Sequence, residues 1–194
     1  MLGLTQPLSQ SGARTGALDT NAERAFEAIF LEHYDRVFRI LLRLLGDAAH
    51  AEELANEVFW RLSRQPQSRL FDSSVAGWLY KTAAHAGIDA LRASAHRKHY
   101  EQAAAREAHH AGSSETGALG TVLREENRRA VQRTLVSMKP AQAQILLLRA
   151  NGSSYKELAA AMGVAVSSVG TLLNRAEEEF RKRYLKLTRH KENV

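Results

Sequence analysis

The sequence predicts an all-α protein in which two small helical domains are joined by a flexible linker. Over most of the 194 residues, apolar side chains recur at steps of three and four, the period of an amphipathic helix. No segment of convincing length shows the alternation of apolar and polar residues that is typical of a strand. Between the two periodic parts, residues 103–120 are small and polar, so we expect the linker there.

The first part of the chain is predicted to form a three-helix domain behind a flexible tail. The tail covers residues 1–20, which are rich in Gly, Ser, Thr and Gln and show no periodicity. The expected helices span residues 21–45, 48–63 and 75–99. Gly46-Asp47 ends the first helix, and a loop over residues 65–74 precedes the third.

The second part begins with a helix over residues 122–137, followed by one that has Pro140 in its first turn. The sequence Ser154-Tyr155-Lys156-Glu157 then has the form of a capping box. Gly163 supplies a turn at positive φ, and Ser167 or Ser168 caps the next helix. These features indicate a helix-turn-helix over residues 154–183, although spacing alone leaves open that two short helices merely pack in a core.

Charge favours the DNA-binding interpretation of this motif. The net charge is +6, which favours an anionic partner, and nucleic acid before a membrane surface. In such a motif the second helix enters the major groove. Ser168, Thr171 and Asn174 are then candidates for contacts with base edges, and Lys156 and Arg175 for contacts with phosphates.

Composition excludes several other classes. The chain has no cysteine, so it forms no disulfide or thiolate metal site. Its histidine pairs, at 96 and 99 and at 109 and 110, lack carboxylates at ligand spacing, and no catalytic motif accompanies them. We therefore expect no enzyme activity, no metal and no cofactor. Without a secretory signal or an apolar run near the ~18 residues of a membrane span, we expect a soluble cytoplasmic protein.

Three longer segments resemble the extracytoplasmic-function (ECF) sigma factors of the sigma-70 family, the minimal two-domain sigma subunits of bacterial RNA polymerase. The segments LLRLLGDAAHAEELANEVFWRL and GWLYKTAAHAGIDALR are similar to the sigma-two domain. The segment LVSMKPAQAQILLLRANGSSYKELAAAMGVAVSSVGTLLNRAEEEFRK is similar to sigma-four. The resemblance implies a sigma-two domain over residues 21–100, a linker over 101–121, a sigma-four domain over 122–187 and a tail over 188–194.

The resemblance also implies two functional surfaces on the sigma-two domain. One docks on the β′ clamp of core RNA polymerase through Glu52, Glu53, Asn56, Glu57 and Arg61. The other recognises and melts the minus-ten element through Leu70, Phe71, Asp72, Ser73, Lys81, Arg92, Arg97 and Lys98. Trp78 lies on the inner stripe of its helix, which favours a core position over a base-stacking role.

By the same resemblance, sigma-four binds the polymerase β flap and reads the minus-thirty-five element. The residues implied are Lys156, Ser167, Ser168, Thr171, Asn174 and Arg175. An anti-sigma factor is a further implied partner. The chain departs from the family at Asn56, where Gln is usual, and at His85, where Asn is usual. Gly170 and Leu172 stand where basic residues are usual, which predicts a weaker minus-thirty-five contact.

The alternative function is a helix-turn-helix repressor or activator that acts without core polymerase. The first domain argues against this alternative, because a repressor needs a ligand-binding or dimerisation module there. Binding to core polymerase distinguishes the two.

Overall fold

The computed structural model describes residues 11–107 and 119–192, which form seven α-helices and one 3-10 helix. The first half consists of α1 (Ser11–Leu45), α2 (Ala48–Ser63), η1 (Gln67–Phe71) and α3 (Val75–Glu107). The second half consists of α4 (Leu119–Ser137), α5 (Pro140–Ala150), α6 (Tyr155–Met162) and α7 (Val166–Glu192). These residues contain no strand, and the predicted all-α fold class is confirmed.

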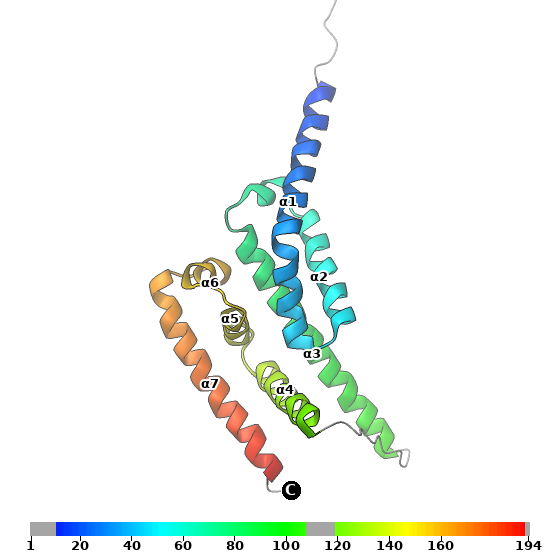
Figure 1. Cartoon of the computed structure of the whole chain (residues 1–194), viewed down its shortest axis with the longest axis vertical. Helices are drawn as coiled ribbons and strands as arrows, with labels where there is room; N and C mark the ends of the chain where they lie inside the picture. Colours follow the sequence, from blue (N-terminus) through cyan, green and yellow to red (C-terminus); the bar gives the residue numbers. More distant parts are fainter. Residues whose placement is uncertain (1–10, 108–118, 193–194) are drawn as a thin grey trace, which may run out of the picture.

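The helices of the first half pack side by side as a bundle (Figure 1). Apolar side chains fill the core between them. Val37, Ile40 and Leu41 of α1 are fully buried against Leu62 of α2 and Leu79 of α3. Burying each such side chain contributes roughly 1.5–3 kcal/mol. Gly46 ends α1 at a φ of +72°, as its position in the sequence predicted.

Parts of both predicted flexible segments are helical in the structure. Residues 11–20 of the expected tail belong to α1, while residues 1–10 lie outside the described part of the chain. Of the expected linker, residues 101–107 continue α3 and residues 119–121 begin α4, with 108–118 outside the described part. The sequence prediction of flexibility rested on the lack of large apolar residues in these segments. However, Ala, Glu, Gln and Arg extend an existing helix at little cost, because only nucleation is strongly unfavourable.

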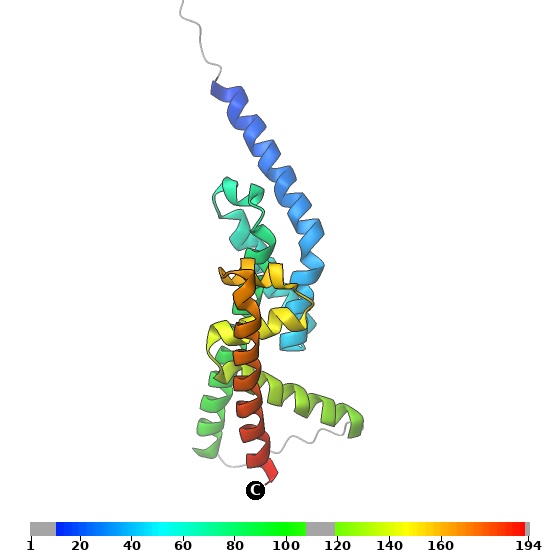
Figure 2. The same ribbon diagram turned by 90° about the vertical axis from the view of Figure 1, so that its left-hand side faces the viewer.

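The two halves are not separated in space. A single cluster of buried apolar side chains runs through both, and it includes Ala83 and Ala84 of α3 together with Met138, Ala143 and Ile145 of the second half. Helices α4, α5 and α6 all contact α3. In Figure 2, α5 and α6 lie across the molecule beside α7. The sequence predicted two domains on a tether, whereas the structure shows them packed against each other.

Candidate nucleic-acid interface

The predicted helix-turn-helix is present in α6 and α7. The axes of the two helices differ by 87°. At the start of α6, the Ser154 hydroxyl accepts a hydrogen bond from the backbone N–H of Glu157, and the Glu157 carboxylate accepts one from the N–H of Ser154, at 3.3 and 2.7 Å. This is the capping box that the sequence predicted. Gly163 ends α6 at a φ of +69°, a conformation that costs glycine little.

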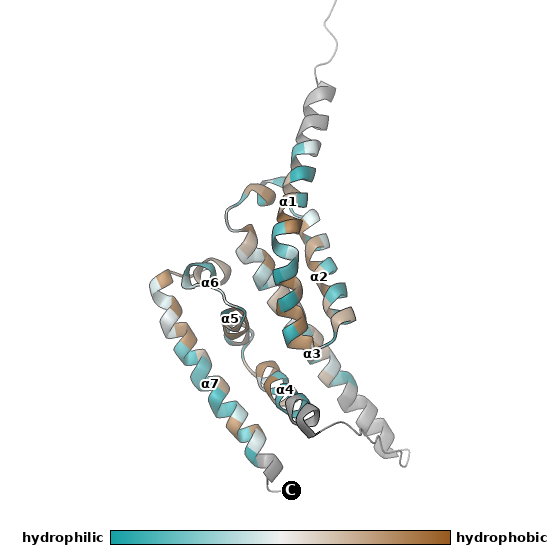
Figure 3. Cartoon of the chain, in the orientation of Figure 1, coloured by the Kyte–Doolittle hydropathy of each residue, from teal (hydrophilic) through white to brown (hydrophobic). Residues whose placement is uncertain are grey.

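The second helix of the motif begins earlier than expected. Because α7 starts at Val166, Ser167 and Ser168 lie in its first turn and do not cap it. Val169 and Leu173 determine which face of α7 points to the core, since both are buried against it. Hydrophilic residues occupy much of the remaining surface of α7 (Figure 3).

All six residues expected to contact the minus-thirty-five element are exposed. They are Lys156 on α6 and Ser167, Ser168, Thr171, Asn174 and Arg175 on α7. Gly170 and Leu172, which stand where basic residues are usual, have different surroundings. Leu172 is half-buried and packs against the core. A Cβ atom at Gly170 would meet only the Tyr155 ring, at 3.9 Å, so a longer side chain has room there.

The predicted minus-ten loop contains the short helix η1 and the turn that follows it. Leu70 is half-buried, Phe71 is 59% exposed, and Asp72 and Ser73 are exposed. The Asp72 carboxylate accepts a hydrogen bond from the backbone N–H of Ser74 at 2.8 Å, and hydrogen bonds from Ser74 lower the pKa of Asp72. The loop therefore presents an apolar ring beside a fixed carboxylate.

Two of the four cations expected to hold minus-ten phosphates are exposed, and they are Lys81 and Arg97. Arg92, also expected to contact a phosphate, is occupied by partners within the chain. It is half-buried and donates to the carbonyl oxygen of Met138 in the second half at 3.3 Å, and it also lies 3.4 Å from Asp89. The side chain of Lys98 lies outside the described part of the structure.

Beside these residues lies an open cavity of about 580 Å³ with a basic lining. The lining residues are Arg61, Arg64, Gln65, Trp78, Lys81, Thr82, His85 and Gln144. Trp78 is half-buried in its wall, so its ring contributes both to the core and to the cavity surface.

The sequence interpretation missed Trp60 as a surface residue. It is 55% exposed, and the Arg64 guanidinium lies 4.3 Å from its ring centroid. The signal was available, because Trp60 falls outside the apolar stripe of α2. An exposed aromatic ring beside an arginine is typical of surfaces that stack nucleic-acid bases.

The residues expected to dock on polymerase share the outer face of α2. Glu52, Glu53 and Asn56 are exposed. Glu57 and Arg61 form an ion pair with an N–O distance of 2.6 Å. Arg61 also lines the basic cavity, so it connects the acidic face of α2 to the minus-ten surface.

Two protein-family descriptions match this chain in the order of the two halves. Residues 29–97 match Sigma-70 region 2, and residues 128–180 match Sigma-70, region 4. The chain belongs to the sigma-70 family.

Its curated relatives include several ECF sigma factors. ECF RNA polymerase sigma factor SigE of Mycolicibacterium smegmatis is 26% identical over 170 residues, which are 84% of this chain and 63% of that protein. RNA polymerase sigma-H factor of Pseudomonas aeruginosa is 27% identical over 80% of this chain and 84% of its own length. ECF RNA polymerase sigma-E factor of Escherichia coli K12 is 28% identical, again over 80% of this chain and 84% of its own length.

A similar solved structure is the sigma factor RpoE in complex with the anti-sigma factor NepR from Bartonella quintana. Its sequence is 18% identical, the TM-score is 0.45, and the match covers 83% of this chain and 96% of that one.

Among the described residues, no single helix is both long and apolar enough to cross a membrane. The pair α6 and α7 meets the criteria of length and composition only when joined across its 87° bend. The same part of the chain contains no group of three or more His, Asp or Glu residues placed to hold a metal ion. His109 and His110 lie outside it.

Proposed function

We propose that this sigma factor binds core RNA polymerase in the bacterial cytoplasm and directs promoter-specific initiation of transcription, with no catalytic step of its own. The observation that carries the proposal is the matching of both sigma-70 regions, in family order, to the two helical halves. The exposed helix-turn-helix of the second half and the basic cavity of the first support it physically.

The proposed division of labour follows the predicted domains. Residues 21–100 act as the sigma-two domain, 101–121 as the connection, and 122–187 as the sigma-four domain. On α2, the exposed carboxylates of Glu52 and Glu53 pair with basic groups of the β′ clamp, and sigma-four contacts the β flap. Exposed interfacial charges of this kind set the register and rate of docking more than its affinity.

At the minus-ten element, the surface is suited to a melted strand. Phe71 offers an exposed ring for an unstacked base, and Lys81 and Arg97 offer cations for its phosphates. Arg92 joins these cations once its bond to the Met138 carbonyl is released. Trp60 and Arg64 extend the surface, and the minus-thirty-five contact is made by α6 and α7.

Control by an anti-sigma factor is part of the proposal. An open apolar groove of about 740 Å³ lies between α4, α5 and α7 and includes Val131, Phe180 and Leu185. Val131 and Leu185 are exposed large apolar residues. Contiguous apolar surface of this kind marks an interaction site for another protein.

The decisive experiment combines the purified chain with core RNA polymerase. We expect a stable complex that starts transcripts at defined sites when a genomic library is the template. Start-site mapping then identifies the promoter sequence. Binding to double-stranded operator DNA without any binding to core polymerase would refute the proposal and favour the repressor or activator.

A further inference from the structure

The end of α7 that is proposed to enter the major groove carries an exposed apolar side chain. Val166 is the first residue of this helix and is 51% exposed. In a helix-turn-helix, the N-terminal residues of the second helix face the base edges. Ser167, Thr171 and Asn174 on the same part of α7 are exposed and polar. Val166 therefore lies beside the proposed polar contacts with the bases and offers them a different chemistry.

Gly170 lies between Val166 and the ring of Tyr155. It follows Val166 by about one turn, so the two residues are neighbours on one face of α7. A Cβ atom at Gly170 would be 3.9 Å from Cε2 of Tyr155, and no other group outside the local helix backbone lies within 4 Å of it. Tyr155 is itself 44% exposed. These three residues, which we call the apolar patch, therefore have open space above the glycine.

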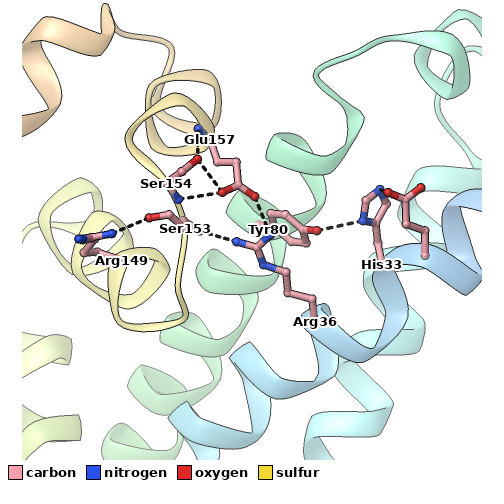
Figure 4. A network of polar contacts seen from close by, with 8 residues as sticks. His33, Arg36, Tyr80, Arg149, Ser153, Ser154 and Glu157 are labelled. Atoms are coloured by element: carbon pink, nitrogen blue, oxygen red, sulfur yellow. Dashed lines mark hydrogen bonds and ion pairs between the residues drawn. The ribbon is translucent and has the colours of Figure 1, made fainter.

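The backbone that carries Tyr155 is held by several hydrogen bonds where α6 begins. In the capping box, one Glu157 oxygen accepts from the N–H and the hydroxyl of Ser154 at 2.7 and 2.8 Å (Figure 4). Arg149 donates to the carbonyl oxygen of Ser153 at 3.1 Å, and its guanidinium lies 5.6 Å from the ring centroid of Tyr155. A contact surface on such a fixed backbone needs little ordering when a ligand binds.

The chemistry of the apolar patch suits one feature of duplex DNA. Its side chains include no cation, and the Tyr155 hydroxyl is their only hydrogen-bond donor. In the major groove, the apolar group that a base presents is the 5-methyl group of thymine. Gly170, which stands where a basic residue is usual, leaves room for such a group. A methyl group above Gly170 would contact the Val166 side chain on one side and the Tyr155 ring on the other.

We propose that the apolar patch is a thymine-reading subsite of the minus-thirty-five contact. The 5-methyl group of one thymine lies over Gly170, between Val166 and the ring of Tyr155. This inference rests on the proposed function and adds the class of base that α7 prefers at one position. It also gives the missing cation a consequence, because a phosphate contact carries no sequence information whereas a contact with a base does.

The test compares duplexes that differ by a single methyl group. Start-site mapping with the holoenzyme, formed by core polymerase and this chain, supplies the promoter. Each thymine of its minus-thirty-five element, on either strand, is then replaced in turn by deoxyuridine, which lacks only the 5-methyl group. We expect one replacement to weaken holoenzyme binding roughly three- to fivefold, the effect of burying one methyl group. Fluorescence anisotropy with labelled duplex measures this change.

The converse change adds a methyl group at the same position. When this base is cytosine paired with guanine, its replacement by 5-methylcytosine should strengthen binding by about the same factor, roughly three- to fivefold. Both cytosines present the same amino group to the major groove, so the gain isolates the contribution of the methyl group.

Two substitutions in the full chain test whether the apolar patch makes this contact. Val166→Ala removes two methyl groups, and Gly170→Ala places a protein methyl group in the space that the base would use. Both should bring the ratio of thymine to deoxyuridine affinity close to one. Leu187→Ala is the matched control, because it shortens an exposed apolar side chain about 30 Å farther along α7. This variant should keep the ratio of the parent.

The affinity ratio separates this inference from a structural effect and from the proposed function. Loss of folded chain or of a phosphate contact weakens binding to both duplexes equally and leaves the ratio unchanged. If no thymine of the element shows a methyl effect, or if the effect persists in either Val166→Ala or Gly170→Ala, the apolar patch does not read thymine, while the sigma function stands. If the chain forms no holoenzyme with core polymerase, the proposed function fails, and this inference fails with it.

Discussion

At the scale of single residues, the carboxylates on the outer face of α2 are not equivalent. Glu57 is already paired with Arg61, whereas Glu53 is exposed on the same face. A pair between exposed partners contributes little to stability, on the order of 0–1 kcal/mol. Replacing either carboxylate should therefore leave the fold intact and affect mainly the docking of the polymerase.

Charge reversal of this face should weaken binding to core polymerase. We expect Glu53→Lys and Glu57→Lys each to lower the affinity roughly tenfold, because each turns an attraction to the clamp into a repulsion. Fluorescence anisotropy with labelled chain and core polymerase measures the effect. Glu23→Lys, an exposed site on α1 outside the proposed surfaces, is the control. Unchanged affinity in the α2 variants would reject this docking face.

His33 makes the stability of the chain depend on pH. Burial lowers its pKa below 6.5, more than the nearby Glu32 raises it, and its Nδ1 lies 2.9 Å from the Tyr80 hydroxyl. The unfolded chain therefore binds more protons here, and the stability that His33 contributes is lost as the pH falls below 6.5. Lowering the pH from 7.5 to 5.5 should reduce the unfolding midpoint more in the parent than in His33→Gln. Equal reductions would contradict the prediction.

At the scale of elements, the helix-turn-helix contains two glycines with opposite roles. Gly163 has a φ of +69° in the turn, whereas Gly170 lies inside α7. We expect Gly163→Ala to destabilise the chain by about 1–2 kcal/mol through backbone strain, since no neighbouring atom lies near its Cβ position. Gly170→Ala should instead stabilise it by about 0.5–1 kcal/mol. Urea unfolding measures both changes in the free energy of unfolding. If the two substitutions changed it in the same direction, the opposite roles of Gly163 and Gly170 would be contradicted.

The recognition helix can also be tested by restoring a cation. Gly170→Arg adds a basic side chain at an open position, so duplex containing the minus-thirty-five element should bind more tightly. The slope of log affinity against log salt concentration should steepen by about 0.9, the value for one additional phosphate contact. Gly170→Ala controls for helix propensity. A slope equal to that of Gly170→Ala would mean that this position does not face the backbone of DNA.

At the scale of the whole molecule, the continuous core predicts how the chain unfolds. Because buried residues of α3 pack with those of α4 and α5, the two halves should unfold together in one thermal transition. Gly77→Leu should separate this into two transitions, one for each half. Differential scanning calorimetry measures it, and two transitions in the parent would contradict a shared core.

Local signals in the sequence were sufficient to predict where most helices lie and to identify the capping box of the helix-turn-helix. The apolar stripe of α2, Pro140 at the start of α5 and the capping box at Ser154 depend on neighbours within a few residues. The ends of the helices were harder to predict. Residues 11–20 and 101–107 are helical because they continue helices whose nuclei lie elsewhere.

By itself, the sequence determined the all-α class and the helix-turn-helix, since periodicity and capping are local, and the resemblance of its longer segments indicated the family and the residues of the proposed minus-thirty-five contact. Only the tertiary structure decided that the halves pack together. It shows that Arg92, an expected phosphate contact, donates to the Met138 carbonyl in this arrangement, and that Arg36 pairs with Glu157, which lies 121 residues away in the chain. Contacts at that separation depend on how whole faces fit, and no local pattern encodes them.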